Sequence, residues 1–215
     1  MVQTLFQKSF CVENNISKQN IYICSVIFLT RWLKNKPGVF MDELFKNKSY
    51  KILELFIAKP AKDFSARGMA RELDVSHATV LNYIEELEKE GLIKKKEETL
   101  YTTYYANTES EKYKFYKKNY LVFKLKDSGL IDYLQKQTLA SSIVLFGSGA
   151  KATFTEKSDV DIFIEAEEKY FDIKKYERII GRKINLLFEP RINNLSKELR
   201  NNILNGELLY GFIRL

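Results

Sequence analysis

Residues 143–151 read Ile-Val-Leu-Phe-Gly-Ser-Gly-Ala-Lys, and residues 158–164 read Ser-Asp-Val-Asp-Ile-Phe-Ile. Each stretch contains an apolar run that is typical of a buried strand, and the first run ends at Gly147. Because side chains alternate along a strand, Asp159 and Asp161 lie on one face, roughly 6.5 Å apart at the backbone. Carboxylates together with phosphate oxygens are the usual ligands of protein-bound Mg²⁺. The pattern therefore predicts two aspartates that share magnesium at a strand end.

Gly147 fits a phosphate site beside this pair. Glycine lets the backbone come close to a ligand, and a helix that begins just after Gly147 would offer free N–H groups and a favourable dipole to an anion. A Gly-Ser pair alone, or an Asp-x-Asp pair alone, is more often a turn or a solvated strand end. Their combination between apolar runs, with ten residues from Gly149 to Ser158 separating them, favours metal-assisted nucleotidyl transfer.

The combination of Gly147-Ser148, ten residues and Asp159-x-Asp161 resembles the signature of the DNA polymerase beta-like nucleotidyltransferases, and among them the minimal nucleotidyltransferases. The resemblance covers about residues 129–213. It implies a small mixed sheet with helices on one side, a nucleoside triphosphate (ATP in the first instance) as donor, and two Mg²⁺ ions. It assigns catalysis to the two aspartates, and it assigns triphosphate binding to Gly147, Ser148, Lys151 and Ser158.

Two positions depart from the family's pattern. The family's third carboxylate sits on a following strand, where this chain has Asn185 as the aligned residue and the expected third metal ligand. An amide oxygen can coordinate a metal, but it cannot accept a proton as a general base. Glu189 shares the strand parity of Asn185 and is an alternative ligand. After Gly-Ser, many members carry Arg-Ala-Arg-Gly, whereas only Lys151 keeps a positive charge here; both departures bear on turnover and not on the fold.

The composition is that of a folded protein. The 215 residues are 45% apolar and 13% aromatic, which is enough for one large or two small domains. The two cysteines, Cys11 and Cys24, are too few for a disulfide framework, and the single histidine, His77, argues against zinc catalysis or histidine-based hydrolysis. These features predict a cytoplasmic protein.

The net charge of +7 is unevenly distributed. Residues 1–40 hold five Lys and Arg against one acid, and residues 107–128 hold six against three. Residues 50–106 hold nine against ten, so the charge by itself is weak support for DNA binding by any compact domain.

Residues 1–49 are predicted to be an N-terminal extension of uncertain structure. Its apolar run over residues 21–33 is too short to span a bilayer and lacks the flanks of a signal peptide, so no membrane association is expected. A recognisable domain pattern begins only after Met41. Two alternatives stay open: an extra element packed on the body, or a chain whose translation starts at Met41.

Residues 50–106 have the pattern of a winged helix. Helical spacing predicts an apolar helix followed by two further helices, capped by Ser65 and Ser76, and Gly91 ends the last of them. Alternation over residues 100–105 predicts a two-stranded hairpin. These parts resemble the winged helix-turn-helix transcription regulators of bacteria and archaea.

That resemblance implies that the third helix enters the major groove of DNA and that the wing contacts the backbone. The glutamates later in this helix leave a protein-interaction module as the alternative. The residues expected to contact bases or phosphates are Arg67, Ser76, His77, Thr79, Asn82, Lys94, Lys95 and Lys96.

Residues 107–128 predict one long linker helix closed by Gly129. Its lysines alternate with aromatic residues, which can stack on nucleic acid. The favoured interpretation is a seam between domains or in a homodimer, with the lysine stems on the outside. The chain is thus predicted to be an α+β protein, in which a winged helix-turn-helix is joined by a long helix to a small mixed-sheet nucleotidyltransferase domain at residues 129–215.

The functional hypothesis combines both modules. It is Mg²⁺-dependent transfer of a nucleoside monophosphate, foremost AMP, from an NTP to a macromolecular hydroxyl, foremost that of a protein. Small members of the family are often antitoxins, so the resemblance makes a HEPN-type toxin a candidate partner. The alternative is a DNA-binding transcriptional regulator whose nucleotidyltransferase domain is inactive and only binds nucleotide or a partner.

Overall fold

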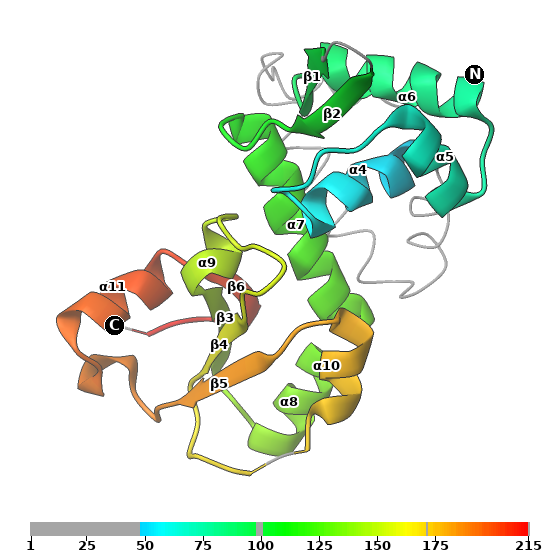
Figure 1. Cartoon of the computed structure of the whole chain (residues 1–215). Helices are drawn as coiled ribbons and strands as arrows, with labels where there is room; N and C mark the ends of the chain where they lie inside the picture. Colours follow the sequence, from blue (N-terminus) through cyan, green and yellow to red (C-terminus); the bar gives the residue numbers. More distant parts are fainter. Residues whose placement is uncertain (1–47, 98–100, 171, 215) are drawn as a thin grey trace, which may run out of the picture. The chain divides into compact units, whose positions relative to one another are not determined.

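The computed structural model describes residues 48–97, 101–170 and 172–214 (Figure 1). The predictions made for residues 1–47 lie outside this part of the chain. In the described residues, none of the helices combines the length and the apolar character needed to cross a membrane.

A helix-turn-helix and a hairpin come first, as the sequence predicts. The elements are α4 (Lys48–Ala58), α5 (Ala66–Leu73), α6 (His77–Lys89), β1 (Ile93–Glu97) and β2 (Thr102–Ala106). Ser65 accepts a hydrogen bond from the backbone N–H of Gly68, and Ser76 accepts one from that of Thr79. Both predicted helix caps are therefore confirmed. The two strands pair in antiparallel register, from Ile93 opposite Ala106 to Glu97 opposite Thr102.

The long helix α7 (Glu111–Asp127) packs against α4 through its tyrosines. Tyr113 is 1% exposed and donates its hydroxyl to the Phe56 carbonyl at 2.9 Å. Tyr120 donates its hydroxyl to Glu54 at 2.8 Å. These two side chains form an intramolecular seam between α7 and α4.

The prediction that all lysine stems of this helix lie outside is wrong at one position. Lys117 is only 3% exposed. It sits one turn after Tyr113 and one turn before Leu121, so it occupies the buried stripe of α7, whose other buried members are Tyr113, Tyr120, Leu121 and Leu125.

A four-stranded mixed sheet follows, in the order β5-β4-β3-β6. β3 (Ser142–Phe146) is antiparallel to β4 (Val160–Ile164) and to β6 (Glu207–Gly211), whereas β4 runs parallel to β5 (Ile184–Phe188). The other elements are α8 (Leu130–Thr138), α9 (Gly147–Ala150), α10 (Lys174–Ile180), the short 3₁₀ helix η2 (Ile192–Asn194) and α11 (Lys197–Leu204). Among them, α8 is a helix that the sequence reasoning missed.

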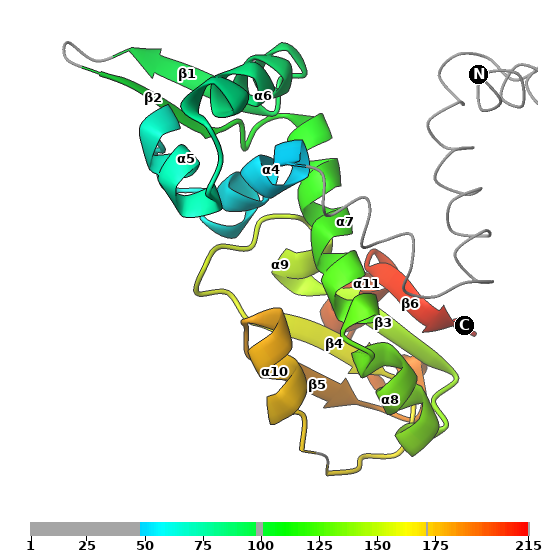
Figure 2. The same cartoon turned by 90° about the vertical axis from the view of Figure 1, so that its right-hand side faces the viewer.

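Helices cover both faces of this sheet, whereas the family resemblance predicts helices on one side. α8 and α10 lie on one side and α11 on the other (Figures 1 and 2). The alternation of β3 explains the difference, because Ile143 and Leu145 face the large core while Val144 packs with Ile192 and Ile203 in a second one. A second apolar face needs its own cover, which η2 and α11 supply.

Candidate nucleotide and metal site

The predicted motif residues meet at one end of the sheet. Phe146, the last residue of β3, is opposite Asp161 of β4, and Asn185 of β5 is opposite Asp161 on the other side. Gly147 directly follows β3, and Asp159 directly precedes β4. Antiparallel and parallel pairing together therefore bring the glycine, the two aspartates and the asparagine to the same strand ends.

Gly147 lies directly against the carboxylate of Asp161. Its φ is +66°, and a Cβ built there would stand 2.6 Å from Oδ2 of Asp161. A side chain at Gly147 would both strain the backbone and displace the carboxylate. The sequence predicts that the Gly147 backbone comes close to a ligand. In the structure this backbone lies close to the Asp161 carboxylate.

The amide of Asn185 bridges the two aspartates. Its Nδ2 donates to Oδ1 of Asp161 at 3.0 Å and faces Oδ2 of Asp159 at 3.4 Å. In this arrangement the amide N–H groups offset the repulsion between two neighbouring carboxylates. Rotation of the amide by half a turn presents Oδ1 in place of Nδ2, which turns the same side chain into a cation ligand.

The residues present fit a magnesium ion. Mg²⁺ takes oxygen ligands and usually keeps several waters or substrate phosphate oxygens, so two carboxylates and one amide oxygen are an adequate protein share. In the part of the chain that the structure describes, no group of three His, Cys, Asp or Glu residues could hold a metal. Asn185 as the third ligand stays a prediction.

Glu189 does not complete the site. It follows β5 at the far end of the strand, where its backbone N–H donates to the Ile164 carbonyl. Its carboxylate accepts a hydrogen bond from Asn194 at 2.7 Å. Glu189 was an alternative metal ligand because it shares the strand parity of Asn185. Its place at the Ile164 end of β4, away from Asp159 and Asp161, excludes that role.

Two cations that the sequence reasoning missed hold the segment between the two motifs. Lys117 of α7 donates to the Phe154 carbonyl at 2.6 Å. Arg182 donates to the Ser158 carbonyl at 3.1 Å and also to the Thr155 carbonyl. The spacing of Lys117 relative to Tyr113 and Leu121 was the available signal for its burial.

Burial sets the electrostatics of these cations. It lowers the pKa of Lys117 to about 8, and nearby Arg182 adds to this effect. Burial likewise holds the pKa of Arg182 below its usual value. Both cations lie over the Phe154 ring, with Lys117 Nζ at 4.5 Å and Arg182 Cζ at 4.8 Å from the centroid, so the ring's π electrons supply part of the missing counter-charge.

Comparison with known proteins agrees with this geometry. The family model described as "Polymerase beta, Nucleotidyltransferase" matches residues 128–212. Two proteins of Methanocaldococcus jannaschii, both named as protein adenylyltransferases, are each 36% identical to this chain over 69 and 67 residues. The matches span 28% of this chain and 69% and 68% of the two relatives. The chain belongs to the polymerase beta nucleotidyltransferase family.

The nucleotidyltransferase domain is preceded by a helix-turn-helix domain, because a family model described as "HTH domain" matches residues 48–100. The crystal structure of the transcriptional regulator BldR from Sulfolobus solfataricus aligns with 57% of this chain and 97% of its own, at 14% identity and a TM-score of 0.30. A score that low supports no argument about fold or function.

The residues predicted to bind triphosphate are engaged in local contacts. Ser148 lies in α9, a single four-residue turn, so the helix dipole expected after Gly147 is small. Lys151 donates to Asn202 of α11 at 3.0 Å. The Ser158 hydroxyl accepts the backbone N–H of Thr155 at 2.8 Å and closes a turn. Their contact with triphosphate stays a prediction.

An open, largely basic pocket adjoins this end of the nucleotidyltransferase sheet. Its volume is about 440 Å³, and it is lined by Lys174, Glu177, Arg178, Gly181, Arg182 and Lys183. It lies near the start of β4, because the Val160 N–H donates to the Lys183 carbonyl. The positive lining makes it a place where an anionic group is favoured.

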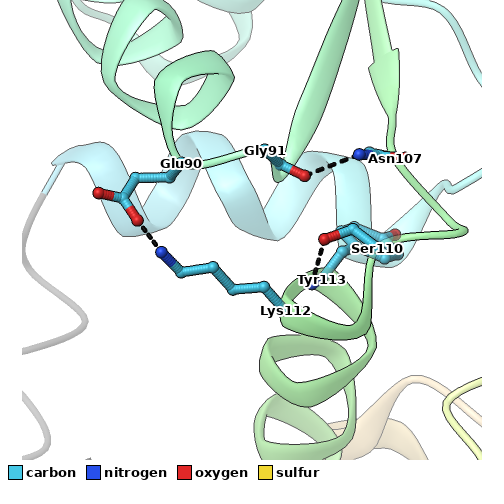
Figure 3. Close-up of polar contacts among 6 residues, drawn as sticks. All are labelled: Glu90, Gly91, Asn107, Ser110, Lys112 and Tyr113. Atoms are coloured by element: carbon cyan, nitrogen blue, oxygen red, sulfur yellow. Dashed lines mark hydrogen bonds and ion pairs between the residues drawn. The ribbon is translucent and has the colours of Figure 1, made fainter. Parts of the chain in front are cut away.

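Three polar contacts lie where the helix-turn-helix domain leads into α7, and one of them, between Lys112 and Glu90, joins α7 to the end of α6 (Figure 3). Lys112 forms an ion pair with Glu90, Asn107 donates to the Gly91 carbonyl at 2.9 Å, and Ser110 caps α7 by accepting the N–H of Tyr113. Lys112 of α7 therefore pairs with Glu90, the residue that caps the C-terminus of α6.

The predicted DNA-contact residues are mostly exposed, but several have partners within the domain. Exposed side chains are Arg67, Ser76, His77, Asn82, Lys94, Lys95 and Lys96. The hydroxyls of Ser76 and Thr79 bond to each other at 2.7 Å. Lys95 pairs with Glu97, and Lys96 pairs with Asp63. DNA contact by these residues stays a prediction.

Proposed function

We propose that this protein transfers a nucleoside monophosphate, AMP from ATP in the first instance, to a protein hydroxyl in the presence of Mg²⁺. The observation that carries the proposal is the meeting of Gly147, Asp159, Asp161 and Asn185 at one end of the sheet. The names of the two relatives support adenylate as the group and a protein as the acceptor.

The site residues have separate tasks in this reaction. Asp159 and Asp161 would hold Mg²⁺, with the amide oxygen of Asn185 as the third protein ligand. Bound Mg²⁺ neutralises phosphate charge and stabilises the in-line displacement at the α-phosphate. Gly147 has no Cβ, which leaves room for the Asp161 carboxylate beside the backbone. Lys151 contributes the positive charge that follows the Gly-Ser pair.

The bonds exchanged are those at the α-phosphorus. The acceptor oxygen forms a bond to it while the bridging oxygen to the β-phosphate departs, and pyrophosphate leaves. Asn185 cannot take the acceptor's proton, and both aspartates are assigned to the metal. The proton of the acceptor hydroxyl therefore passes to solvent water, and turnover is expected to be slower than with a third carboxylate.

The transfer is tested with ATP labelled at the α-phosphate, Mg²⁺ and the product of the neighbouring gene, of which a HEPN-type toxin is the expected kind. Label on that protein, absent with Asp159→Ala, supports the proposal. If the acceptor stays unlabelled while ATP binds, the proposed transfer is wrong, and nucleotide binding without turnover is favoured.

The second candidate is a DNA-binding regulator whose nucleotidyltransferase domain binds nucleotide without turnover. Asn185 at the third ligand position is the observation that favours it. For either candidate we propose that α6 and the hairpin contact DNA, which the match to a helix-turn-helix model supports. His77→Ala and Asn82→Ala should each weaken specific binding to the protein's own promoter by about tenfold or more, and unchanged binding would exclude this mode.

A further inference from the structure

We propose that Lys117 is a positioning residue for the nucleotide site: its buried ammonium, presented by α7, fixes the Phe154 carbonyl and with it the segment 154–158 that leads into Asp159. The inference rests on the proposed function, because this segment joins the Gly147-Ser148 motif to the two aspartates.

Among the residues that the structure describes, Lys117 is buried without a carboxylate partner. It is 3% exposed, and its Nζ donates to one backbone carbonyl at 2.6 Å. Its other neighbours are the rings of Phe154 and Tyr113, at 4.5 and 5.8 Å from Nζ, and the cation Arg182. Lysine is almost never fully buried unless it is paired, because desolvating an ammonium is costly. A methionine, which is uncharged and one atom shorter, would avoid that cost, so stability does not explain the lysine.

The segment held by Lys117 is also anchored by the Phe154 side chain, which is 1% exposed in the core, and by the hydrogen bond from the Ser158 N–H to the Thr155 carbonyl. Arg182 holds the carbonyls of Thr155 and Ser158, and the Ser158 hydroxyl closes the turn on Thr155. Phe154 lies at the upstream end of this turn, and Lys117 provides the polar contact there. Loss of that contact would free the approach to Asp159 from one side, while Arg182 would still hold the other.

The helix that carries Lys117 is itself fixed on both sides. Tyr113 lies one turn before Lys117 and donates to the Phe56 carbonyl, and Tyr120 lies one turn after it and donates to Glu54. The ammonium therefore projects from a helix that cannot easily rotate. This is the support that a positioning group needs.

Lys117→Met tests the inference, with Lys114→Met as the matched control, because Lys114 is on the same helix and forms an ion pair with Glu111. Amide hydrogen exchange over residues 153–159 and calorimetric titration of ATP in Mg²⁺ are measured for both variants and the wild type. We expect Lys117→Met to exchange about tenfold faster in this segment and to bind ATP about tenfold more weakly. Lys114→Met should match the wild type.

Lys117→Gln, which retains a hydrogen-bond donor, should give intermediate exchange and affinity. Unchanged exchange and affinity in Lys117→Met overturn the proposal. If neither Lys117 variant folds, the lysine is structural and the proposal is likewise wrong. A wild-type protein that binds no ATP would contradict the proposed function, whereas the exchange comparison would still report on the hold that Lys117 has on Phe154.

Discussion

Nδ2 of Asn185 lies 3.0 Å from Oδ1 of Asp161, directly across the parallel β4–β5 pair. This hydrogen bond occupies a carboxylate oxygen that a cation would also use. The proposed Mg²⁺ binding would therefore need the amide to turn its oxygen toward the aspartates. In the proposed metal site, the asparagine would stabilise the metal-free state and would be a weaker ligand than a carboxylate for bound Mg²⁺.

Asn185→Asp should reverse this balance. Without metal, a third carboxylate beside Asp159 and Asp161 should lower the free energy of unfolding by about 1 kcal/mol through like-charge repulsion. Millimolar Mg²⁺ should raise the melting temperature of the variant more than that of the wild type, because the added carboxylate binds the ion. Thermal unfolding with and without Mg²⁺ measures both effects. Equal Mg²⁺ responses in the two proteins would show that residue 185 is not at a metal site.

Gly147→Ala should damage the site more than it damages the fold. The positive φ costs about 1 kcal/mol of unfolding free energy for any residue with a Cβ, and the new methyl would collide with Oδ2 of Asp161. Gly129→Ala is the control, because its φ is +76° and nothing lies within 4 Å of the added Cβ. Both variants should lose similar stability in urea titrations, and only Gly147→Ala should bind Mg²⁺-ATP about tenfold more weakly. Equal ATP affinities in the two variants would show that the contact between Gly147 and Asp161 does not matter for nucleotide binding.

Lys117 should leave a signature in the pH dependence of stability. Burial lowers its pKa from 10.5 to about 8. Between these values the unfolded chain binds more protons than the folded one, so the contribution of Lys117 to the free energy of unfolding rises with pH. From pH 7.5 to 9.5 the wild type should gain about 1–2 kcal/mol relative to Lys117→Met.

This comparison isolates one group. The pKa values of Tyr113 and Tyr120 are raised by burial, and Arg182 faces the same ring, but these groups are present in both proteins. Urea unfolding at three pH values gives the difference directly. A difference that is constant with pH would mean that the lysine titrates normally and is not buried as a cation.

The seam between α7 and α4 should depend on the Tyr113 hydroxyl. Tyr113→Phe leaves the Phe56 carbonyl without its side-chain donor in a buried position, which should cost about 1–2 kcal/mol of unfolding free energy. Tyr116→Phe is the control, because Tyr116 is 37% exposed and should change stability by less than about 0.5 kcal/mol. Similar losses of stability in both variants would contradict a stabilising role of the Tyr113 hydroxyl between α7 and α4.

The parts of the fold that local pattern determines could be predicted from the sequence. Ser65 and Ser76 cap helices as expected, and the apolar runs around Gly147 and Asp161 are paired strands. Spacing predicts the helices of residues 50–106, the hairpin and the long helix. The winged-helix arrangement and the mixed sheet are expectations from the two family resemblances.

The remaining features depend on residues that are distant in the chain. The burial of Lys117 is fixed by Phe154, and the exclusion of Glu189 is fixed by its position opposite the Ile164 end of β4. The second apolar face of the sheet depends on the contact of Val144 with Ile203, which is distant in the sequence. The helix α8 was missed because it begins directly after Gly129, which was assigned only the role of ending α7.

Titration of ATP into the protein with and without Mg²⁺ tests the central claim most directly, using the wild type, Asp161→Asn and the control Asp127→Asn, an exposed acid at the end of α7. We predict Mg²⁺-dependent binding in the wild type and in Asp127→Asn, and an affinity at least about tenfold lower in Asp161→Asn, because one carboxylate of the metal site is lost. Equal affinity in all three proteins, or binding that does not depend on Mg²⁺, would contradict a metal-nucleotide site at Asp159 and Asp161.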